Sequence, residues 1–436
     1  MIELAWESWA KRIEAARVVR GVGKVKGITG LKIEAIGPEV ALGEVCMVQS
    51  RGNDNILAEV VGFRSEVVEL MPYGSMQGIS PGAKVISMGR GLMARVGNGM
   101  LGRVIDPLGN PLDKLGPLDS SEVREIDCEP PDPISRPRIQ EMLPLGIRSI
   151  DSCISCGKGQ RIGVFAGSGV GKSTLMGMIA RNTQADVNVI ALIGERGREV
   201  REFIETALGE EGLARSVVVV ATSSEPAVVR LKGAYVATAI AEYFRDQGKD
   251  VMLMMDSVTR FALAQREIGL AVGEPPTTRG YTPSVFAMLP RLFERAGPAP
   301  LGTITGFYTV LVEGGDLDEP VADAVRGLLD GHIVMSREMA QLGHFPAIDV
   351  LASVSRLINE IASDSHKKHQ VALREILSVY RQAKDLIDIG AYQSGSNPRI
   401  DRAISKHEMI QAFLRQSTEE KVPLEEVLTR MARIVQ

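Results

Sequence analysis

The sequence of 436 residues predicts an α/β protein in three parts: a small β-barrel, a core with a parallel β-sheet, and a helical C-terminal domain. Three observations support this fold class. Short apolar runs between glycines fill residues 23–88, longer apolar runs alternate with helical stretches from about 145 to 355, and strand-like runs end at Leu357. Buried strands that alternate with helices are typical of a parallel sheet covered by helices.

Composition narrows the class of protein. Hydrophobic residues make up 44% and charged residues 24% of the chain, which is typical of a globular protein and excludes a disordered or fibrous one. The net charge of −4 and the 4% of aromatic residues argue against nucleic-acid binding, which favours basic surfaces and stacking platforms. We find no apolar run near the ~20 residues that span a bilayer, and the charged N-terminus lacks the apolar segment of a signal peptide. We therefore expect a cytoplasmic protein.

Residues 2–17 have the spacing of an amphipathic helix, with Ile2, Trp6, Trp9 and Ile13 on one face. Two interpretations remain open. The helix folds back on its own barrel, or residues 1–20 form an exposed partner-docking helix, because tryptophan is a frequent anchor of protein interfaces.

Residues 21–88 carry the pattern of a β-barrel domain. Its β-like runs are 31–35, 44–49, 57–61 and 67–71, and glycine turns separate them. A proline-rich connector between Pro107 and Pro137 then leads into the α/β core.

The core is predicted from fully apolar runs, which indicate buried parallel strands. They cover residues 162–165, 187–193, 217–221 and 251–255. Helices are expected to begin near Lys172, Arg198, Val229 and Arg260. In the C-terminal domain, residues 366–389 and 401–415 show helical spacing.

Four cysteines are present, and Cys153 and Cys156 form a CxxC pair. No second cysteine pair or suitably spaced histidine pair completes a zinc site in the sequence. We expect two reduced cysteines packed in the core.

The stretch 166–174, AGSGVGKST, follows a predicted strand and opens a predicted helix, which is the arrangement of a P-loop. Glycines let successive N–H groups converge on phosphate oxygens, and the helix N-terminus adds favourable dipole charge. Lys172 is expected to bridge the β- and γ-phosphates, and Ser173 to offer its hydroxyl to Mg²⁺. The predicted ATP-binding residues are Gly167, Ser168, Gly169, Val170, Gly171, Lys172, Ser173 and Thr174.

Three further residues are candidates for catalysis. Asp256 ends an apolar strand, where a carboxylate can hold the Mg²⁺ shell after a P-loop; alone, it would read as an ordinary strand-end cap. Glu195 ends the strand 187–193 within GERGRE and can polarise water, although the same run suits a solvated helix cap. Arg356 in SVSR has the chemistry of an arginine finger, but its spacing alone does not single it out.

Taken together, several motifs resemble the hexameric α/β ATPase family, which includes the rotary ATP synthase head subunits and the protein-export ATPases of type III secretion. They are GSGVGKST, GERGREV, DSVTRFALAQREI, GEPPTTRGYTPSVFAMLPRLFERAG and GHFPAIDVLASVSR. Within this family, the sequence FYTVLVEGGDLDEPVADAVRGLLDGHI and its pair Arg326-Gly327 resemble the flagellar export branch.

The resemblance implies a RecA-like ATPase domain over residues 89–357 and a helical domain over 358–436. It makes Glu195 the catalytic base, places Arg196 by the γ-phosphate, and makes Arg356 a finger inserted into the neighbouring subunit's site. It also places Phe345 on the adenine ring, with Phe413 in the same pocket.

The resemblance further implies a Mg-ATP-hydrolysing homohexamer that energises export of flagellar proteins. Implied partners are a stator-like regulator bound by the N-terminal helix, a central stalk protein, export substrates with their chaperones, and the export gate at the cytoplasmic face of the membrane. No nucleic-acid partner is expected.

Four alternatives remain at this point: an injectisome ATPase, a rotary ATP synthase catalytic subunit, an RNA-translocating ring helicase, and a non-catalytic nucleotide-binding subunit. Acidic charge and few aromatics argue against the helicase. Glu195 argues against the non-catalytic subunit, since regulatory sites of this family typically replace that carboxylate.

Overall fold

The computed structural model describes residues 21–51, 55–120 and 122–436. The predicted N-terminal helix therefore lies outside the described residues. The chain divides into two compact units. One contains the barrel with the segments Glu225–Val229 and Ala264–Pro283, and the other contains the remaining core and the C-terminal helices.

The barrel is closed by six of the described strands in the order β1-β2-β5-β4-β3-β6. They are β1 (Val22–Thr29), β2 (Lys32–Ile36), β3 (Val45–Val48), β4 (Ile56–Arg64), β5 (Val67–Pro72) and β6 (Lys84–Ser87). Alternating side chains such as Ile33, Ala35, Val68 and Leu70 fill its interior. The four predicted runs became β2 to β5; β1 and β6, rich in lysine and glycine or very short, were not predicted.

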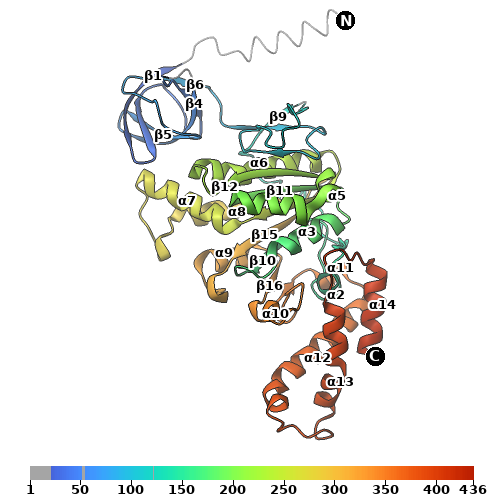
Figure 1. The fold of residues 1–436 in the computed structure, drawn as a ribbon. Coiled ribbons are helices and arrows are strands. Elements are labelled where there is room, and N and C mark those ends of the chain that lie inside the picture. Colours follow the sequence, from blue (N-terminus) through green and yellow to red (C-terminus); the bar gives the residue numbers. More distant parts are fainter. Residues whose placement is uncertain (1–20, 52–54, 121) are drawn as a thin grey trace, which may run out of the picture. The chain divides into compact units, whose positions relative to one another are not determined.

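The second unit is organised around one sheet with the strand order β17-β16-β10-β15-β13-β11-β12-β8, and β14 pairs with β15. Figure 1 labels β16, β10, β15, β11 and β12 of this sheet. The strands are β8 (Val104–Ile105), β10 (Arg161–Ala166), β11 (Val187–Glu195), β12 (Ser216–Thr222), β13 (Asp250–Asp256), β14 (Gly297–Pro298), β15 (Thr303–Leu311), β16 (Gly331–Met335) and β17 (Val354–Ser355). A separate pair joins β7 (Met93–Val96) and β9 (Glu122–Glu125). The strands from β8 to β16 along this order run parallel, as predicted from the apolar runs.

The register brings functional segments to one edge of the sheet. Ala166, at the end of β10, lies opposite Leu311 of β15 and Met335 of β16. Asp256, at the end of β13, lies opposite Leu192 of β11. The P-loop and the predicted carboxylates therefore share the carboxyl edge, where open α/β sheets bind ligands.

Helices connect the strands and form the C-terminal part. They are α2 (Arg148–Cys153), α3 (Lys172–Asn182), α4 (Gly197–Glu202), the π-helix η1 (Phe203–Leu208), α5 (Gly209–Ala214), α6 (Ala227–Asp246), α7 (Val258–Val272), α8 (Pro283–Phe293), α9 (Pro320–Leu328), α10 (Arg337–Gln341), α11 (Ile358–Ile361), α12 (Asp364–Asp388), α13 (Pro398–Leu414) and α14 (Leu424–Val435), with 3₁₀ turns at Thr278–Gly280 and Glu313–Gly315. The helix starts expected near Lys172, Arg198, Val229 and Arg260 are confirmed to within two residues by α3, α4, α6 and α7.

Local chemistry explains where the C-terminal helices begin. The Ser363 side chain accepts a hydrogen bond from the His366 N–H and caps α12. Asn397 caps α13 in the same way, and Pro398 occupies the first helical position, where it loses no hydrogen bond. Helix α14, which was not predicted separately, buries Val427 and Met431 in a core shared with α2 and the sheet.

The CxxC cysteines belong to this core. Cys153 is 2% and Cys156 0% exposed, and both are free. Burial raises the pKa of Cys153 to about 11 and that of Cys156 well above its ordinary value, so both stay protonated and unreactive. Among the described residues, no group of three or more His, Cys, Asp or Glu side chains is arranged to hold a metal ion. Within the same residues, no helix is long and apolar enough to cross a membrane.

Candidate active site

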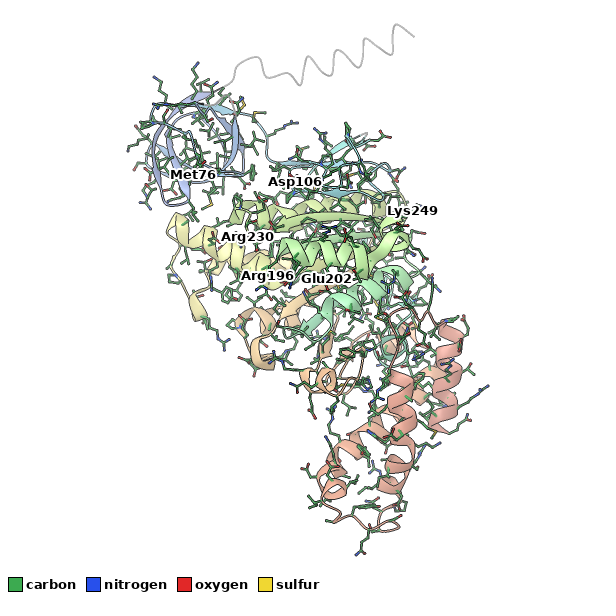
Figure 2. All side chains as sticks on the ribbon, viewed as in Figure 1. Met76, Asp106, Arg196, Glu202, Arg230 and Lys249 are labelled. Carbon is green, nitrogen blue, oxygen red and sulfur yellow. The ribbon has the colours of Figure 1, made fainter. Side chains whose placement is uncertain are left out.

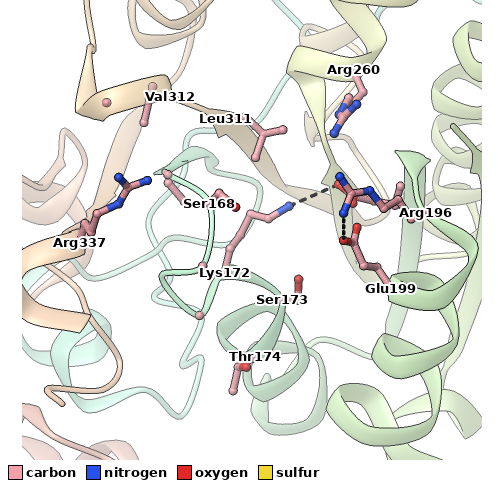
Figure 3. Close-up of a pocket in the computed structure, with 16 residues that line it drawn as sticks. Ser168, Lys172, Ser173, Thr174, Arg196, Glu199, Arg260, Leu311, Val312 and Arg337 are labelled. Carbon is pink, nitrogen blue, oxygen red and sulfur yellow. Dashed lines mark ion pairs between the residues drawn. The ribbon is translucent and has the colours of Figure 1, made fainter. Parts of the chain in front are cut away.

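A cavity of about 550 Å³ opens at the carboxyl edge of the sheet, around the P-loop (Figure 3). The P-loop contributes Gly167, Ser168, Gly169, Gly171, Lys172, Ser173 and Thr174 to its lining. Glu195, Arg196, Glu199, Arg260 and Arg337 supply the remaining charged side chains. The cavity is therefore polar, and its four cationic side chains outnumber its two carboxylates, which suits a phosphate-rich ligand.

The P-loop backbone depends on two glycines. Gly169 and Gly171 have φ values of 77° and 87°, in the left-handed region that favours glycine. Gly171 is also the N-cap of α3, so the first N–H groups of that helix lie at the end of the loop. Such N–H groups lack partners within the helix and suit phosphate oxygens. Val170 instead is 1% exposed and anchors the loop in the core.

Lys172 lies at the centre of the charged groups. Its Nζ forms an ion pair with the Asp256 carboxylate and lies 3.7 Å from Glu195 Oε1. Thr309 of β15 donates a hydrogen bond of 2.8 Å to Asp256 Oδ1. Asp256 is 3% exposed, so its charge is stabilised by this lysine and this hydroxyl.

Glu195 has an unusual protonation equilibrium. Burial and the nearby charge of Asp256 raise its pKa to about 7, against the lowering effect of Lys172. The hydrogen bond between Glu195 and Glu199 also raises the pKa of Glu195, and it lowers the pKa of Glu199. A carboxyl group that titrates near neutral pH is suited to proton transfer.

Three arginines line the cavity. Arg337 and Arg196 lie on opposite sides of Lys172 (Figure 3). Arg196 pairs with Glu199, 3.5 Å from its Oε1, and its side chain is 72% exposed. Arg196 directly precedes α4 and Glu202 is the last residue of α4; both are labelled in Figure 2. Arg260 lies in α7, the helix that follows Asp256 at the end of β13. Its Nε is buried and has no hydrogen-bond partner among the described residues. These guanidinium groups are placed to neutralise phosphate charge.

Five of the predicted site residues do not line this cavity. Two of them, Val170 and Asp256, lie buried beside it, and the other three are Phe345, Phe413 and Arg356. Phe345 is 46% exposed, and its ring lies close to Gly171, since a Cβ at that glycine would be 3.6 Å from the ring. Phe413 is 6% exposed and packs in the core, where its carbonyl accepts a hydrogen bond from the Arg148 side chain. Phe345 thus presents an open face near the P-loop, whereas Phe413 does not.

Arg356 also lies outside the cavity lining. It is exposed, its Nη2 donates to the Arg326 carbonyl at 3.2 Å, and it directly follows β17. Strand β17 pairs with the first residues of β16, Gly331 opposite Ser355. Arg356 therefore lies at the amino edge of the sheet, opposite the P-loop edge.

Sequence reasoning gave no role to four residues that the fold brings to the site. Glu199 and Arg260 belong to the motifs GERGREV and DSVTRFALAQREI. Because they lie close in sequence to Glu195 and Asp256, their place at the site could have been predicted. Thr309 and Arg337 belong to β15 and α10, elements that were not predicted, and nothing local marks them.

The residues present fit a magnesium ion. Ser173 and Asp256 offer a hydroxyl and a carboxylate oxygen, the hard donors that Mg²⁺ prefers, and both line a small space next to the cavity. When bound there, Mg²⁺ would neutralise charge on the phosphates.

Family models match most of the chain. "ATP synthase alpha/beta family, nucleotide-binding domain" matches residues 146–355, "ATP synthase alpha/beta family, beta-barrel domain" residues 25–89, and "T3SS EscN ATPase C-terminal domain" residues 362–433. The chain belongs to the ATP synthase alpha/beta family. The predicted fold class and family are thereby confirmed, while the predicted domain boundaries remain predictions.

Relatives in the ATP synthase alpha/beta family resemble the whole chain. The "Flagellum-specific ATP synthase" of Bacillus subtilis is 56% identical and covers 97% of each chain. The assembled ATPase EscN from the type III secretion system of enteropathogenic E. coli has a TM-score of 0.90 and 44% identity over 95% of this chain and 100% of its own. A second EscN structure, in complex with its central stalk EscO, has a TM-score of 0.89 and 44% identity over 95% and 100%.

Proposed function

We propose that this protein hydrolyses Mg-ATP as a homohexamer and that hydrolysis energises the type III export of flagellar proteins. The observation that supports a ring of subunits is the position of Arg356. Strand β10, six residues and about 20 Å long at the usual rise per residue, separates the P-loop edge from the edge of Arg356. An arginine finger on that edge serves the site of a neighbouring copy, not its own.

In this mechanism the chain's own groups divide the work of hydrolysis. The P-loop N–H groups and Lys172 hold the β- and γ-phosphates, and the phosphates replace Asp256 as a partner of the lysine. Glu195, as the carboxylate, orients a water molecule and accepts its proton as the oxygen attacks the γ-phosphorus. The bond between the γ-phosphorus and the oxygen that bridges it to the β-phosphate breaks, and that oxygen leaves with ADP. ADP and phosphate are then released, and the proton passes from Glu195 to solvent through the open cavity.

The remaining site residues bind and orient the nucleotide. Arg196 lies beside Glu195, where it can neutralise the γ-phosphate. Phe345, with its open ring face near Gly171, is proposed to stack on adenine. Phe413 would support that pocket from the core rather than contact adenine directly, given its 6% exposure.

The flagellar substrate class rests on the comparison of relatives. Identity is 56% and 51% with the flagellum-specific relatives from Bacillus subtilis and Treponema pallidum, against 50% with the type III secretion ATPase of Xanthomonas euvesicatoria and 44% with EscN. We therefore favour flagellar export over an injectisome or a rotary synthase. By analogy with EscN and its stalk EscO, the proposed partners include a central stalk protein. Export substrates with chaperones, the export gate at the cytoplasmic face of the membrane, and a stator-like regulator that binds residues 1–20 complete the proposal.

Two variants test hydrolysis and ring architecture together. Lys172→Ala removes the cation of the P-loop, and Arg356→Ala removes the finger while the P-loop stays complete. Each alone should be nearly inactive, with a loss of about 10³–10⁵ in rate for the finger. In a random equal mixture, about a quarter of the interfaces combine an intact Lys172 with an intact Arg356, so turnover should recover.

The controls are subunit exchange and concentration. Exchange is verified by a fluorescent label on each variant, and the wild-type rate per subunit should rise with protein concentration as rings assemble. Mixed rings that exchange subunits yet stay inactive would contradict action in trans. A constant rate per subunit at all concentrations would contradict an assembled active form.

A further inference from the structure

Gln160 lies at the amino end of the strand that carries the P-loop. It directly precedes β10, and its side chain is 0% exposed. Its Oε1 accepts a hydrogen bond of 2.8 Å from Gly157 N, and its Nε2 donates to the Asp330 carbonyl at 3.0 Å and to Ser355 Oγ at 3.2 Å. A buried amide with its oxygen and nitrogen both bonded is a rigid connector.

Both acceptors of this amide belong to the chain segments that hold Arg356. The Asp330 carbonyl also accepts the backbone N–H of Arg356 at 3.0 Å. Ser355 directly precedes Arg356, and its hydroxyl donates to the Ser155 carbonyl at 2.8 Å. Gln160 is thus one residue from β10 on one side and one hydrogen bond from the neighbour of Arg356 on the other.

Backbone contacts reinforce the same connection. Arg161 N donates to Asp330 Oδ2 at 3.0 Å, and Asp330 N donates to the Arg161 carbonyl at 2.9 Å. The Arg161 side chain adds hydrogen bonds of 3.1 and 3.3 Å to the same carboxylate. The first residue of β10 and the residue before β16 are therefore locked together from both directions.

We propose that Gln160 is a positioning residue for Arg356: its buried amide fixes the backbone from which this arginine reaches the neighbouring subunit's ATP. The inference rests on the proposed function of Arg356. It adds that a residue adjacent to the chain's own P-loop strand controls catalysis in the next subunit. The role does not require Gln160 to touch nucleotide.

Geometry explains why such a connector is needed. The long side chain of Arg356 loses much rotamer freedom when it is ordered. Among the residues that the structure describes, its only side-chain hydrogen bond is that of Nη2 to the Arg326 carbonyl. The position of its backbone therefore decides where the guanidinium can reach. A displacement of about 1 Å at a catalytic group can cost about 10²-fold in rate.

The first experiment compares two matched substitutions in the assembled protein. Gln160→Met keeps the length of the side chain and removes the amide. Asn188→Leu is the control, because Asn188 is also 0% exposed and its Nδ2 likewise donates to a carbonyl, that of Ala180, and to a serine hydroxyl, that of Ser216. Asn188 lies at the same edge of the sheet, on β11, away from Arg356.

We expect Gln160→Met to lower kcat about 10–10²-fold while the affinity for Mg-ATP stays within about twofold of wild type. Asn188→Leu should keep kcat within about threefold even where both variants lose similar thermal stability. Equal losses of kcat in the two variants would assign Gln160 a structural role only.

The second experiment asks in which subunit the defect acts. Gln160→Met mixed with Lys172→Ala should recover turnover, because an intact P-loop then lies beside an intact Arg356 held by an intact Gln160. No recovery in rings with proven subunit exchange would overturn the proposal, since the defect would then lie in the variant's own ATP site.

Ser355→Ala keeps the proposal testable where Gln160→Met does not fold. It removes one hydroxyl from a half-buried residue and should lower kcat about three- to tenfold, again recovered by Lys172→Ala. Arg356→Ala distinguishes a failure of the proposed arginine finger from a failure of the role proposed for Gln160. Full activity of Arg356→Ala would overturn the proposed finger itself, whereas an inactive Arg356→Ala with fully active Ser355→Ala and Gln160→Met would overturn only the role of Gln160.

Discussion

Polar and charged side chains lie at both edges of the central sheet, but their partners differ between the two edges. At the carboxyl edge, Lys172 pairs with the carboxylates of Asp256 and Glu195 across an open cavity. At the amino edge, Gln160 and Asp330 bind backbone groups of their own fold. A ligand can replace the partners of the first set but not of the second. Side chains that pair with each other around a cavity suit chemistry, and side chains that bind backbone suit the maintenance of geometry.

Lys172→Ala should show the largest effect of the carboxyl edge. Loss of the ammonium removes its charge-assisted hydrogen bonds to phosphate, so affinity for ATP should fall about 10²-fold and turnover should be undetectable. Binding of a fluorescent ATP analogue measures this. The control is Lys384→Ala, whose exposed ion pair with Glu338 at 3.8 Å contributes little. Near-normal ATP affinity in Lys172→Ala would contradict the assignment of residues 166–174 as an ATP-binding P-loop.

Glu195→Gln should separate binding from turnover. The amide has the shape of the carboxyl group but cannot accept a proton, so kcat should fall about 10²–10⁴-fold while Mg-ATP still binds. Glu202→Gln, an exposed position at the end of α4, is the matched control and should stay within about twofold of wild type. A turnover of Glu195→Gln within a few-fold of wild type would make Glu195 a structural cap.

Wild type and Glu195→Gln should also differ in how their stability depends on pH. In the nucleotide-free fold, burial raises the pKa of Glu195 to about 7, above its ordinary value of 4.5. The folded state therefore favours the protonated form, and the free energy of unfolding falls as pH rises from about 4.5 to 7. Relative to Glu195→Gln, wild type should lose about 3 kcal/mol between pH 4.5 and 8. Urea unfolding at several pH values measures the difference, and a constant difference would contradict the raised pKa.

Asp330→Ala tests the amino edge. Three hydrogen bonds from Arg161 are lost, so the free energy of unfolding should fall by about 2 kcal/mol. Affinity for ATP should stay within about twofold, because the P-loop lies at the other edge. Asp323→Ala removes an exposed pair with Arg326 and should cost less than about 1 kcal/mol. A loss of ATP affinity in Asp330→Ala without a loss of stability would reverse the roles assigned to the two edges.

These edges also differ in how far sequence could predict them. The carboxyl edge was predicted in large part, because a P-loop is local and the apolar runs before Glu195 and Asp256 mark strands whose ends must meet. The amino edge was not, because its hydrogen bonds join Gln160 to residues 170 and 195 positions away. No short pattern encodes such distances.

Strand β15 shows why part of the carboxyl edge was missed as well. Its sequence TITGFYTVL places threonines and a glycine among apolar residues, so it does not read as a buried apolar run. The threonines are nonetheless buried, since Thr305 is 1% and Thr309 0% exposed. Their hydroxyls are satisfied by partners from other strands and loops, which only the folded chain supplies.

These two threonines give the smallest and sharpest test of the comparison. They lie four residues apart on one face of β15, so they point the same way at opposite edges of the sheet. Thr309 donates to Asp256 at the carboxyl edge, and Thr305 accepts the Gly159 N–H at the amino edge. Valine matches threonine in shape and removes only the hydroxyl, which should cost about 1–2 kcal/mol in either place.

The cost should appear in different measurements. Thr309→Val leaves Asp256 with Lys172 as its partner, so the carboxylate is less well oriented for Mg-ATP. KM for Mg-ATP should rise about three- to tenfold, with kcat within about threefold. Thr305→Val leaves a buried backbone N–H unpaired, so the melting temperature should fall while KM stays within about twofold. Equal shifts of KM in the two variants would show that the two edges are not functionally separate, because a hydroxyl at the amino edge would then matter to the nucleotide as much as one beside it.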